Sequence, residues 1–318
     1  MAINGAVSVP PLLRLVRIEY AAAGIHLYEF RDPAGAALPA FEAGAHVDLH
    51  LGNGQLRQYS LLNAPGERHR YVVGIKRDAH SRGGSAWVHD ALRVGDLLPV
   101  SAPRCHFPLD ETREHTVLIG GGIGITPLAC MAQRLRAIGR PYTLHYSVRR
   151  REEAALLDLL QGPELQLHVD EERGGLLDIP ALVAAAPASA ALYCCGPGPM
   201  LDSFEAAARA RPGLAWRVER FAATADAATS GGYRVRLAAS GKLVFVQEGH
   251  TLLEALRESG LDVPTSCEQG ICGTCETRVI SGRPDHRDAL LSDEEKASNR
   301  TMMICCSGSL DAELVLDL

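Results

Sequence analysis

Three features are missing from this 318-residue sequence, and each absence argues against a class of protein. Basic residues are not in excess, because 32 Lys and Arg stand against 38 Asp and Glu, and the net charge of -6 argues against general nucleic-acid binding. No apolar run approaches the roughly 20 residues that cross a bilayer, so we expect no membrane span. The first residues lack the basic start, apolar core and cleavage site of an export signal, so we expect a cytoplasmic protein.

What is present is enough apolar sequence for several folded domains. Apolar residues make up 47% of the chain and charged residues 22%, and the length exceeds what a single core usually supports. The first hundred residues alternate short β-rich runs with turn signals, which predicts an antiparallel barrel. From about residue 115 a strand, a glycine turn, a helix and another strand follow one another, which predicts a parallel sheet covered by helices.

A stretch of small and polar residues without periodicity, AATADAATSGG, interrupts this pattern near residue 225 and predicts a linker. A β-hairpin and a short amphipathic helix are expected after it. We therefore expect a first domain over residues 1–110, a second over 111–224, a linker over 225–232 and a third domain over 233–318.

Five of the nine cysteines fall in the third domain, and a reducing compartment requires an explanation other than disulfides for them. Three of them form the string C-x4-C-x2-C and a fourth follows 30 residues later: Cys267, Cys272, Cys275 and Cys305. This spacing is typical of the ligands of a plant-type [2Fe-2S] cluster. Gly270 and Gly273 between the ligands would let the backbone approach the cluster and point N–H groups at sulfur.

The alternative for these thiols is a structural zinc site, and the chain would then be a zinc-stabilised binding module without redox activity. Zinc sites usually contain two C-x2-C pairs, or cysteine with histidine, whereas this segment contains one C-x2-C pair. The spacing therefore favours the iron-sulfur cluster. Chemistry alone does not decide whether Cys305 or Cys306 is the fourth ligand.

Two glycine-rich turns follow strands of the expected parallel sheet. The first, GGGIGITP at 120–127, opens a helix, where backbone N–H groups can receive a pyrophosphate. Thr126 can cap that helix or bind a ligand, and Pro127 suits a first helical turn. The second turn, CGPGPM at 195–200, begins with Cys195, which either packs in the core or faces a bound nicotinamide. Taken alone, each turn could also be a tight connection without a ligand.

The barrel region contains RQYSL at 57–61, GIK at 74–76 and SRGGSAWVH at 81–89, which together suit a flavin. Arg57 offers a fixed fork of donors to a phosphate. Tyr59 offers a flat face and a hydroxyl, and Ser60 offers a donor toward the ring edge. Each of these residues by itself could be ordinary barrel surface.

In this order, and together with the glycine turns and the cysteine string, these segments resemble the phthalate dioxygenase reductase family. The resemblance runs from about residue 10 to residue 318. It implies a multidomain α/β and β fold: an antiparallel flavin-binding β-barrel, a Rossmann-like parallel α/β NAD domain and a C-terminal β-grasp plant-type ferredoxin domain.

The resemblance also implies the residues that bind each cofactor. The FMN set is Arg57, Tyr59, Ser60, Ile75, Lys76, Gly83, Gly84 and Ser85, with Phe221 expected near the flavin. The NADH set is Gly121, Gly122, Gly124, Thr126, Pro127, Cys195, Gly196 and Pro197, with Arg149 near the adenosine. The iron ligands are Cys267, Cys272, Cys275 and Cys305. FAD is not excluded by these residues, and the basic run RRREE at 149–153 leaves a 2′-phosphate site, and so NADPH, open.

This cofactor set implies a function, because NADH gives up two electrons as hydride whereas the cluster accepts one at a time. A flavin is needed between them. Ser60, Thr126 and Cys195 are expected to position the reacting rings. By resemblance, the acceptor is a Rieske-type oxygenase in aromatic-compound catabolism, served by a monomeric reductase. A reductase for a cytochrome P450 or another acceptor is the alternative.

Overall fold

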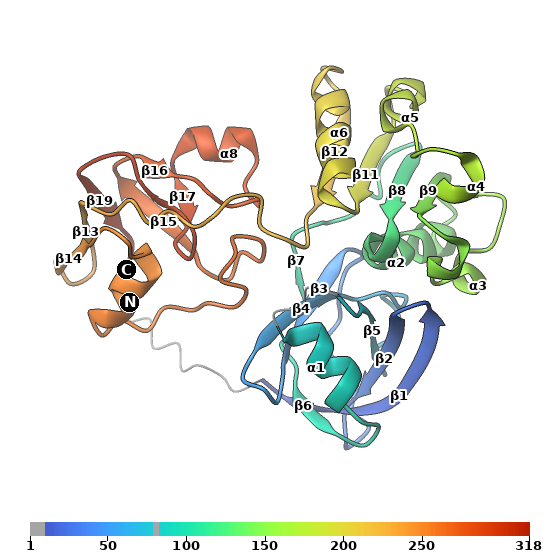
Figure 1. The fold of residues 1–318 in the computed structure, drawn as a ribbon, viewed down its shortest axis with the longest axis horizontal. Helices are drawn as coiled ribbons and strands as arrows, with labels where there is room; N and C mark the ends of the chain where they lie inside the picture. Colours follow the sequence, from blue (N-terminus) through green and yellow to red (C-terminus); the bar gives the residue numbers. More distant parts are fainter. Residues whose placement is uncertain (1–9, 79–82) are drawn as a thin grey trace. The chain divides into compact units, whose positions relative to one another are not determined.

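The computed structural model describes residues 10–78 and 83–318, so Ser81 and Arg82 of the expected flavin segment lie outside the described residues (Figure 1). The chain divides into two compact units, Met1–Glu219 and Arg220–Leu318. The limits of the three expected domains stay a prediction. Among the described residues, no helix has the length and apolar character needed to cross a membrane.

The first unit begins with two antiparallel sheets that close into the flavin-type barrel. Their strand orders are β5-β2-β1-β6 and β4-β3-β7, and isolated bridges from Leu49 to Val100 and from Leu61 to Val73 join the sheets. The elements are β1 (Leu12–Ala22), β2 (Ile25–Arg31), β3 (Ala45–His50), β4 (Leu56–Ser60), β5 (Tyr71–Lys76), α1 (Gly84–Ala91), β6 (Leu97–Pro99) and β7 (Arg104–Cys105). Strand β6 is short and ends at Pro99, which has no backbone N–H to extend the ladder.

The rest of the first unit is a parallel sheet of order β10-β9-β8-β11-β12. Its elements are β8 (Thr116–Gly121), the 3-10 turn η1 (Gly122–Gly124), α2 (Ile125–Ala137), β9 (Tyr142–Val148), η2 (Arg151–Glu153), α3 (Leu157–Leu160), β10 (Leu165–Val169), α4 (Asp170–Arg173), α5 (Ile179–Ala185), β11 (Ala191–Cys195), α6 (Gly198–Arg209) and β12 (Ala215–Glu219). The strand order reverses between β8 and β11, which makes this point the expected ligand crevice. Both glycine turns follow these two strands.

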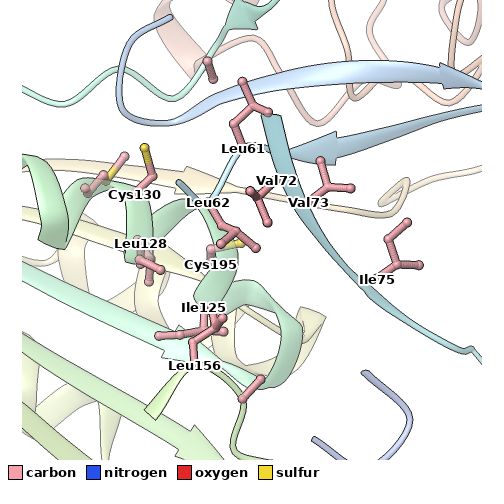
Figure 2. Packing of buried hydrophobic residues seen from close by; sticks show 14 of the residues in the cluster. Leu61, Leu62, Val72, Val73, Ile75, Ile125, Leu128, Cys130, Leu156 and Cys195 are labelled. Atoms are coloured by element: carbon pink, nitrogen blue, oxygen red, sulfur yellow. The ribbon is translucent and has the colours of Figure 1, made fainter. Parts of the chain in front are cut away.

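One hydrophobic cluster runs from the barrel into the parallel sheet. Figure 2 shows Leu61 and Leu62 from the barrel near Leu128 and Cys130 of α2. Alternate residues of β8 point to opposite faces, so Leu118 joins this cluster while Val117 and Ile119 pack in a second one with α5 and α6. Because α2 is covered by the sheet and by the barrel, nine of its residues are buried. This shared core joins the flavin-type barrel to the parallel sheet.

The second unit has its own core under a mixed sheet of order β14-β13-β19-β15-β17. Its elements are β13 (Tyr233–Leu237), β14 (Leu243–Val246), α7 (Leu252–Glu258), β15 (Glu276–Ser281), β16 (Pro284–Asp285), α8 (Asp293–Ser298), β17 (Thr301–Met303), β18 (Gly308–Ser309) and β19 (Glu313–Leu316). Thr251 and Glu254 form a capping box that fixes the start of α7. Part of the stretch expected as a linker is tied to this unit, because the Ala228 N–H donates to the Cys306 carbonyl at 2.8 Å.

Candidate redox site

The expected phosphate end of the flavin site lies where β4 meets the start of α1. A Cβ on Gly84 would lie 2.5 Å from Nε of Arg57, so any other residue at the start of the helix would push the guanidinium away from its present place. Gly83, which precedes the helix, has a φ of 98°, a left-handed conformation that favours glycine. The structure thus places Arg57 beside the helix N-terminus, and both offer donors to an anion.

The other candidate flavin residues surround β5 and the same helix. Ile75 is buried, and its carbonyl is 2.9 Å from Nε2 of His89. Lys76 is partly exposed and faces Glu153 at 3.9 Å. Ser85 Oγ accepts a hydrogen bond from the Asp78 N–H at 3.2 Å. Burial raises the pKa of Tyr59 to about 12, so this phenol stays protonated at neutral pH.

The two glycine turns contact each other at the reversal point of the sheet. A Cβ on Gly124 would lie 2.3 Å from the Cys195 carbonyl oxygen, and one on Gly121 would lie 2.6 Å from Cδ of Pro197. One on Gly196 would lie 3.1 Å from the Gly121 backbone. Glycine at these positions is therefore required for the two turns to meet. Gly122 differs, since it has open space around it and a φ of 53°.

Ser60 and Cys195 are brought together by a carboxylate that the sequence analysis gave no role. Ser60 Oγ donates to Oε2 of Glu219 at 3.4 Å, and Cys195 Sγ donates to the same oxygen at 3.9 Å. Burial raises the pKa of Glu219 to about 8, although the hydrogen bonds from Ser60 and Cys195 lower it in part. Cys195 is fully buried, and burial also raises the pKa of its thiol. This triad can hold a proton at neutral pH.

A sequence signal for Glu219 did exist. The residue ends β12, and the parallel register pairs it with Cys195 at the end of β11. Carboxyl ends of neighbouring parallel strands meet at one edge of a sheet, where ligands bind. An acidic residue closing the strand next to Cys195 was therefore a candidate from its position alone.

Thr126 lies near this group but does not cap the helix. Gly124 occupies the N-cap of α2, and Thr126 Oγ1 donates to the Ile123 carbonyl at 3.0 Å. A Cβ on Gly74 of β5 would lie 2.9 Å from the Thr126 methyl group, which shows how closely the turn approaches the barrel. Pro127 lies in the first turn of α2, as expected.

The basic run after β9 is largely neutralised by carboxylates. Arg150 pairs with Glu152 at 2.7 Å, and Arg151 pairs with Glu172 at 2.6 Å. Arg149 is exposed, and its expected place near a bound adenosine stays a prediction. This pairing fits NADH, which has no 2′-phosphate to bind.

Phe221 lies beyond β12, in the second compact unit, and 43% of its surface is exposed. Its expected place near the flavin stays a prediction.

The four candidate iron ligands lie in the second unit, around the segment between α7 and β15. Cys272, Cys275 and Cys305 are buried, and Cys267 is partly exposed. The Gln269 N–H donates to Cys267 Sγ at 3.3 Å, as expected for a loop that points its amides at sulfur. Gly270 and Gly273 have φ angles of 67° and 71°, and glycine adopts these without strain.

The candidate thiols contact one another in pairs. The pKa of Cys272 is raised to about 12, mainly by a hydrogen bond with Cys267 and secondly by burial. The Cys267 thiol also interacts with that of Cys305, so these two candidate ligands lie close together, and the choice of Cys305 over Cys306 stays a prediction. In the part of the chain that the structure describes, no three acidic, imidazole or thiol groups surround a point that could hold one metal ion. The donor set and the glycine loop fit a [2Fe-2S] cluster, since four thiolates hold it through two irons.

Comparison with known proteins assigns the class of this chain. Residues 237–308 match the family model of the 2Fe-2S iron-sulfur cluster binding domain. The chain is 53% identical over 315 residues to the phenoxybenzoate dioxygenase subunit beta of Ectopseudomonas oleovorans, covering 98% of this chain and 99% of that protein. With the barrel and the parallel sheet, these matches define an oxidoreductase that uses a flavin, NADH and a [2Fe-2S] cluster for electron transfer.

Two solved structures are similar to this chain, one over nearly its whole length and one as part of a longer protein. The crystal structure of phthalate dioxygenase reductase has a TM-score of 0.71 and 39% identity, covering 96% of this chain and 97% of that one. An intact type IV self-sufficient cytochrome P450 monooxygenase has a TM-score of 0.90 and 38% identity over 97% of this chain, which spans only 41% of that protein. The chain belongs to the phthalate dioxygenase reductase family. The family match confirms the expected fold and favours the iron-sulfur cluster over the zinc-stabilised module.

Proposed function

We propose that this chain is the reductase component of a Rieske-type aromatic oxygenase or O-demethylase system and carries electrons from NADH through FMN and the cluster to the oxygenase. It acts as a monomer in the cytoplasm. The relatives support an oxygenase as the electron acceptor, since one is a dioxygenase subunit and another is phthalate dioxygenase reductase.

The observation that carries the proposal is the meeting of three distant segments in the first unit. Strand β4 supplies Ser60, strand β11 ends at Cys195, and β12 ends at Glu219. The donors at Arg57 and the start of α1 suit the single phosphate of FMN. A bound flavin would accept hydride and release electrons one at a time.

The chain's own residues would orient the cofactors and can hold a proton beside them. The turns at 120–127 and 195–200 lie at the strand ends where backbone N–H groups of such turns bind a pyrophosphate, and their close contact fixes one relative to the other. Burial raises the pKa of Glu219 to about 8, which favours the protonated carboxyl group at neutral pH, and in that form the group can donate as well as accept a hydrogen bond. The buried Ser60 and Cys195 hold that carboxyl group in one orientation.

The test is reconstitution with purified acceptors. NADH, this chain and each of several Rieske-type oxygenases of aromatic carboxylates or aryl ethers are mixed without oxygen, and bleaching of the Rieske absorption is followed. We expect rapid reduction of at least one oxygenase. Reduction of none of them, with full reduction of cytochrome c, would contradict the proposed acceptor.

A cytochrome P450 is the second candidate acceptor, and the likeness to the self-sufficient P450 monooxygenase favours it. A bacterial P450 under carbon monoxide, which shows its reduction as an absorption band, belongs in the same assay. Faster reduction of the P450 than of every oxygenase would favour this second candidate.

A further inference from the structure

A buried acidic residue lies against the cluster loop without being one of the expected ligands. Asp288 is 2% exposed and belongs to the segment between β16 and α8. A Cβ on Gly270, in the loop between Cys267 and Cys272, would lie 2.8 Å from Cα and 3.0 Å from Cβ of Asp288. The Ala289 N–H donates to the Gly270 carbonyl at 3.0 Å. The segment around Asp288 thus packs directly on the loop that would surround the cluster.

The Asp288 carboxylate organises this segment from inside. Its Oδ2 accepts hydrogen bonds from the backbone N–H groups of Leu290 and Leu291, at 3.2 and 2.8 Å. Lys296 of α8 approaches the same oxygen at 3.9 Å and donates to the Asp288 carbonyl at 2.6 Å. A buried carboxylate with two amide donors fixes the course of a loop much more firmly than an exposed one.

The other carboxylate oxygen is less well satisfied. Within residues 10–78 and 83–318, the buried Oδ1 of Asp288 has no hydrogen-bond partner, and Nδ1 of His286 lies 3.7 Å from it. The His286 side chain is 9% exposed, and its two ring nitrogens likewise have no hydrogen-bond partner among these described residues. The negative charge of Asp288 is therefore only partly compensated.

The same segment also contacts the chain directly after the last two cysteines. The Arg287 N–H donates to Ser307 Oγ at 3.2 Å, and Asp285 pairs with Gly308 between β16 and β18. A Cβ on Gly270 would also lie only 2.5 Å from Sγ of Cys306. Asp288 thus lies where the cluster loop, its own segment and the chain following Cys305 converge.

We propose that Asp288 is a positioning residue for the iron-sulfur cluster, with two separable effects. Its hydrogen bonds hold its segment against Gly270 and so keep the cluster loop in place. Its buried negative charge lowers the reduction potential of the cluster, because net charge and surrounding hydrogen bonds set the potential of thiolate-ligated clusters. This inference rests on the proposed ligands Cys267, Cys272, Cys275 and Cys305.

Two substitutions in the full-length protein separate the effects. Asp288→Asn keeps an oxygen that can accept from Leu290 and Leu291 but removes the charge. Asp288→Ala removes both. Asp285→Asn is the matched control, because it removes one negative charge from the same segment, where the side chain is 20% exposed and pairs with Arg287 at 2.8 Å.

The readouts do not depend on turnover. Iron and acid-labile sulfide are counted in protein purified without oxygen, the midpoint potential is measured by redox titration followed by electron paramagnetic resonance, and the lifetime of the cluster is measured under a chelator. We expect Asp288→Asn to keep its iron and to have a more positive potential than wild type and Asp285→Asn. We expect Asp288→Ala to lose its cluster about tenfold faster than wild type, as the loss of hydrogen bonds to a buried charge implies.

The opposite results are equally distinct. Equal potentials for Asp288→Asn and Asp285→Asn would overturn the electrostatic effect. Loss of the cluster from Asp288→Asn would overturn the claim that the two effects are separable. A wild-type cluster lifetime in Asp288→Ala would overturn the positioning effect. If Asp288→Ala does not fold, Asp288→Asn still decides the electrostatic effect. Failure of the proposed ligands looks different, because the wild-type chain would then lack iron or Cys272→Ser would keep a normal cluster.

Discussion

The two compact units build their sites in different ways. In the first unit, residues from β4, from both glycine turns and from the end of β12 meet only because one continuous core joins the barrel to the parallel sheet. In the second unit, three of the four candidate ligands fall within one loop, and Cys275 and Cys305 are members of a separate core. The nucleotide and flavin site therefore depends on tertiary packing, whereas the cluster site depends mainly on local sequence.

The largest test of this difference is Cys272→Ser. We expect it to abolish NADH-dependent reduction of cytochrome c but to leave reduction of ferricyanide largely intact, because only the second unit loses its cofactor. Both rates are measured on one preparation. Cys130→Ser is the control, since this buried thiol of the first unit donates to the Asn63 carbonyl at 3.2 Å and a hydroxyl can replace it. Equal loss of both activities in Cys272→Ser would contradict the separation of the units.

The converse test acts on the contact between the two glycine turns. In Gly124→Ala the new methyl group would collide with the backbone of Cys195, and overpacking of this kind costs about 1–3 kcal/mol. We expect lower activity with ferricyanide and cytochrome c alike, together with a lower unfolding temperature and a normal iron content. Gly175→Ala, at a position with open space, should behave like wild type. Unchanged activity in Gly124→Ala would show that the turns need not touch.

A third test uses the raised pKa of Glu219. Because its pKa is about 8 in the folded protein and near 4.5 otherwise, the folded state holds an extra proton between these values. The contribution of Glu219 to the free energy of unfolding is therefore fully present below the pKa of the unfolded state and is lost as pH rises through the pKa of the folded state. We expect the unfolding temperature, followed by flavin fluorescence, to fall between about pH 5 and about pH 9. Glu219→Gln should flatten this fall, and an equal fall in the variant would refute the assignment.

The smallest expected effect concerns the start of the cluster loop. Glu268 has a left-handed φ of 54°, and its carboxylate pairs with Arg257 of α7 at 2.6 Å. Both side chains are nearly half exposed, so Arg257→Ala should lower the free energy of unfolding by only about 0–1 kcal/mol. The free energy of unfolding is measured by denaturant titration followed at the cluster absorption. Arg278→Ala is the control, because it breaks the looser pair with Asp317. A much larger loss would show that this pair holds the loop.

The cluster site, which lies mainly within one loop, can be predicted from the sequence further than the flavin and nucleotide site, which joins distant segments. The cysteine spacing and the two loop glycines are local, so the expected cluster loop and its left-handed glycines could be predicted residue by residue. The helix after the first glycine turn was predicted for the same reason. The contacts of Glu219 with Ser60 and of Arg57 with Gly84 join residues that are distant in sequence, so the sequence can suggest the residues but not these contacts. Thr126 shows the same limit, because the preceding 3-10 turn moves the N-cap to Gly124.

The central claim is that one chain carries a flavin in its first unit and an iron-sulfur cluster in its second. Its most direct measurement is the content of flavin, iron and acid-labile sulfide in full-length protein purified without oxygen. We predict bound FMN together with iron and sulfide in equal amounts, and loss of the iron but not of the flavin in Cys272→Ser. Protein that contains neither flavin nor iron, or that contains zinc in place of iron, would contradict the account.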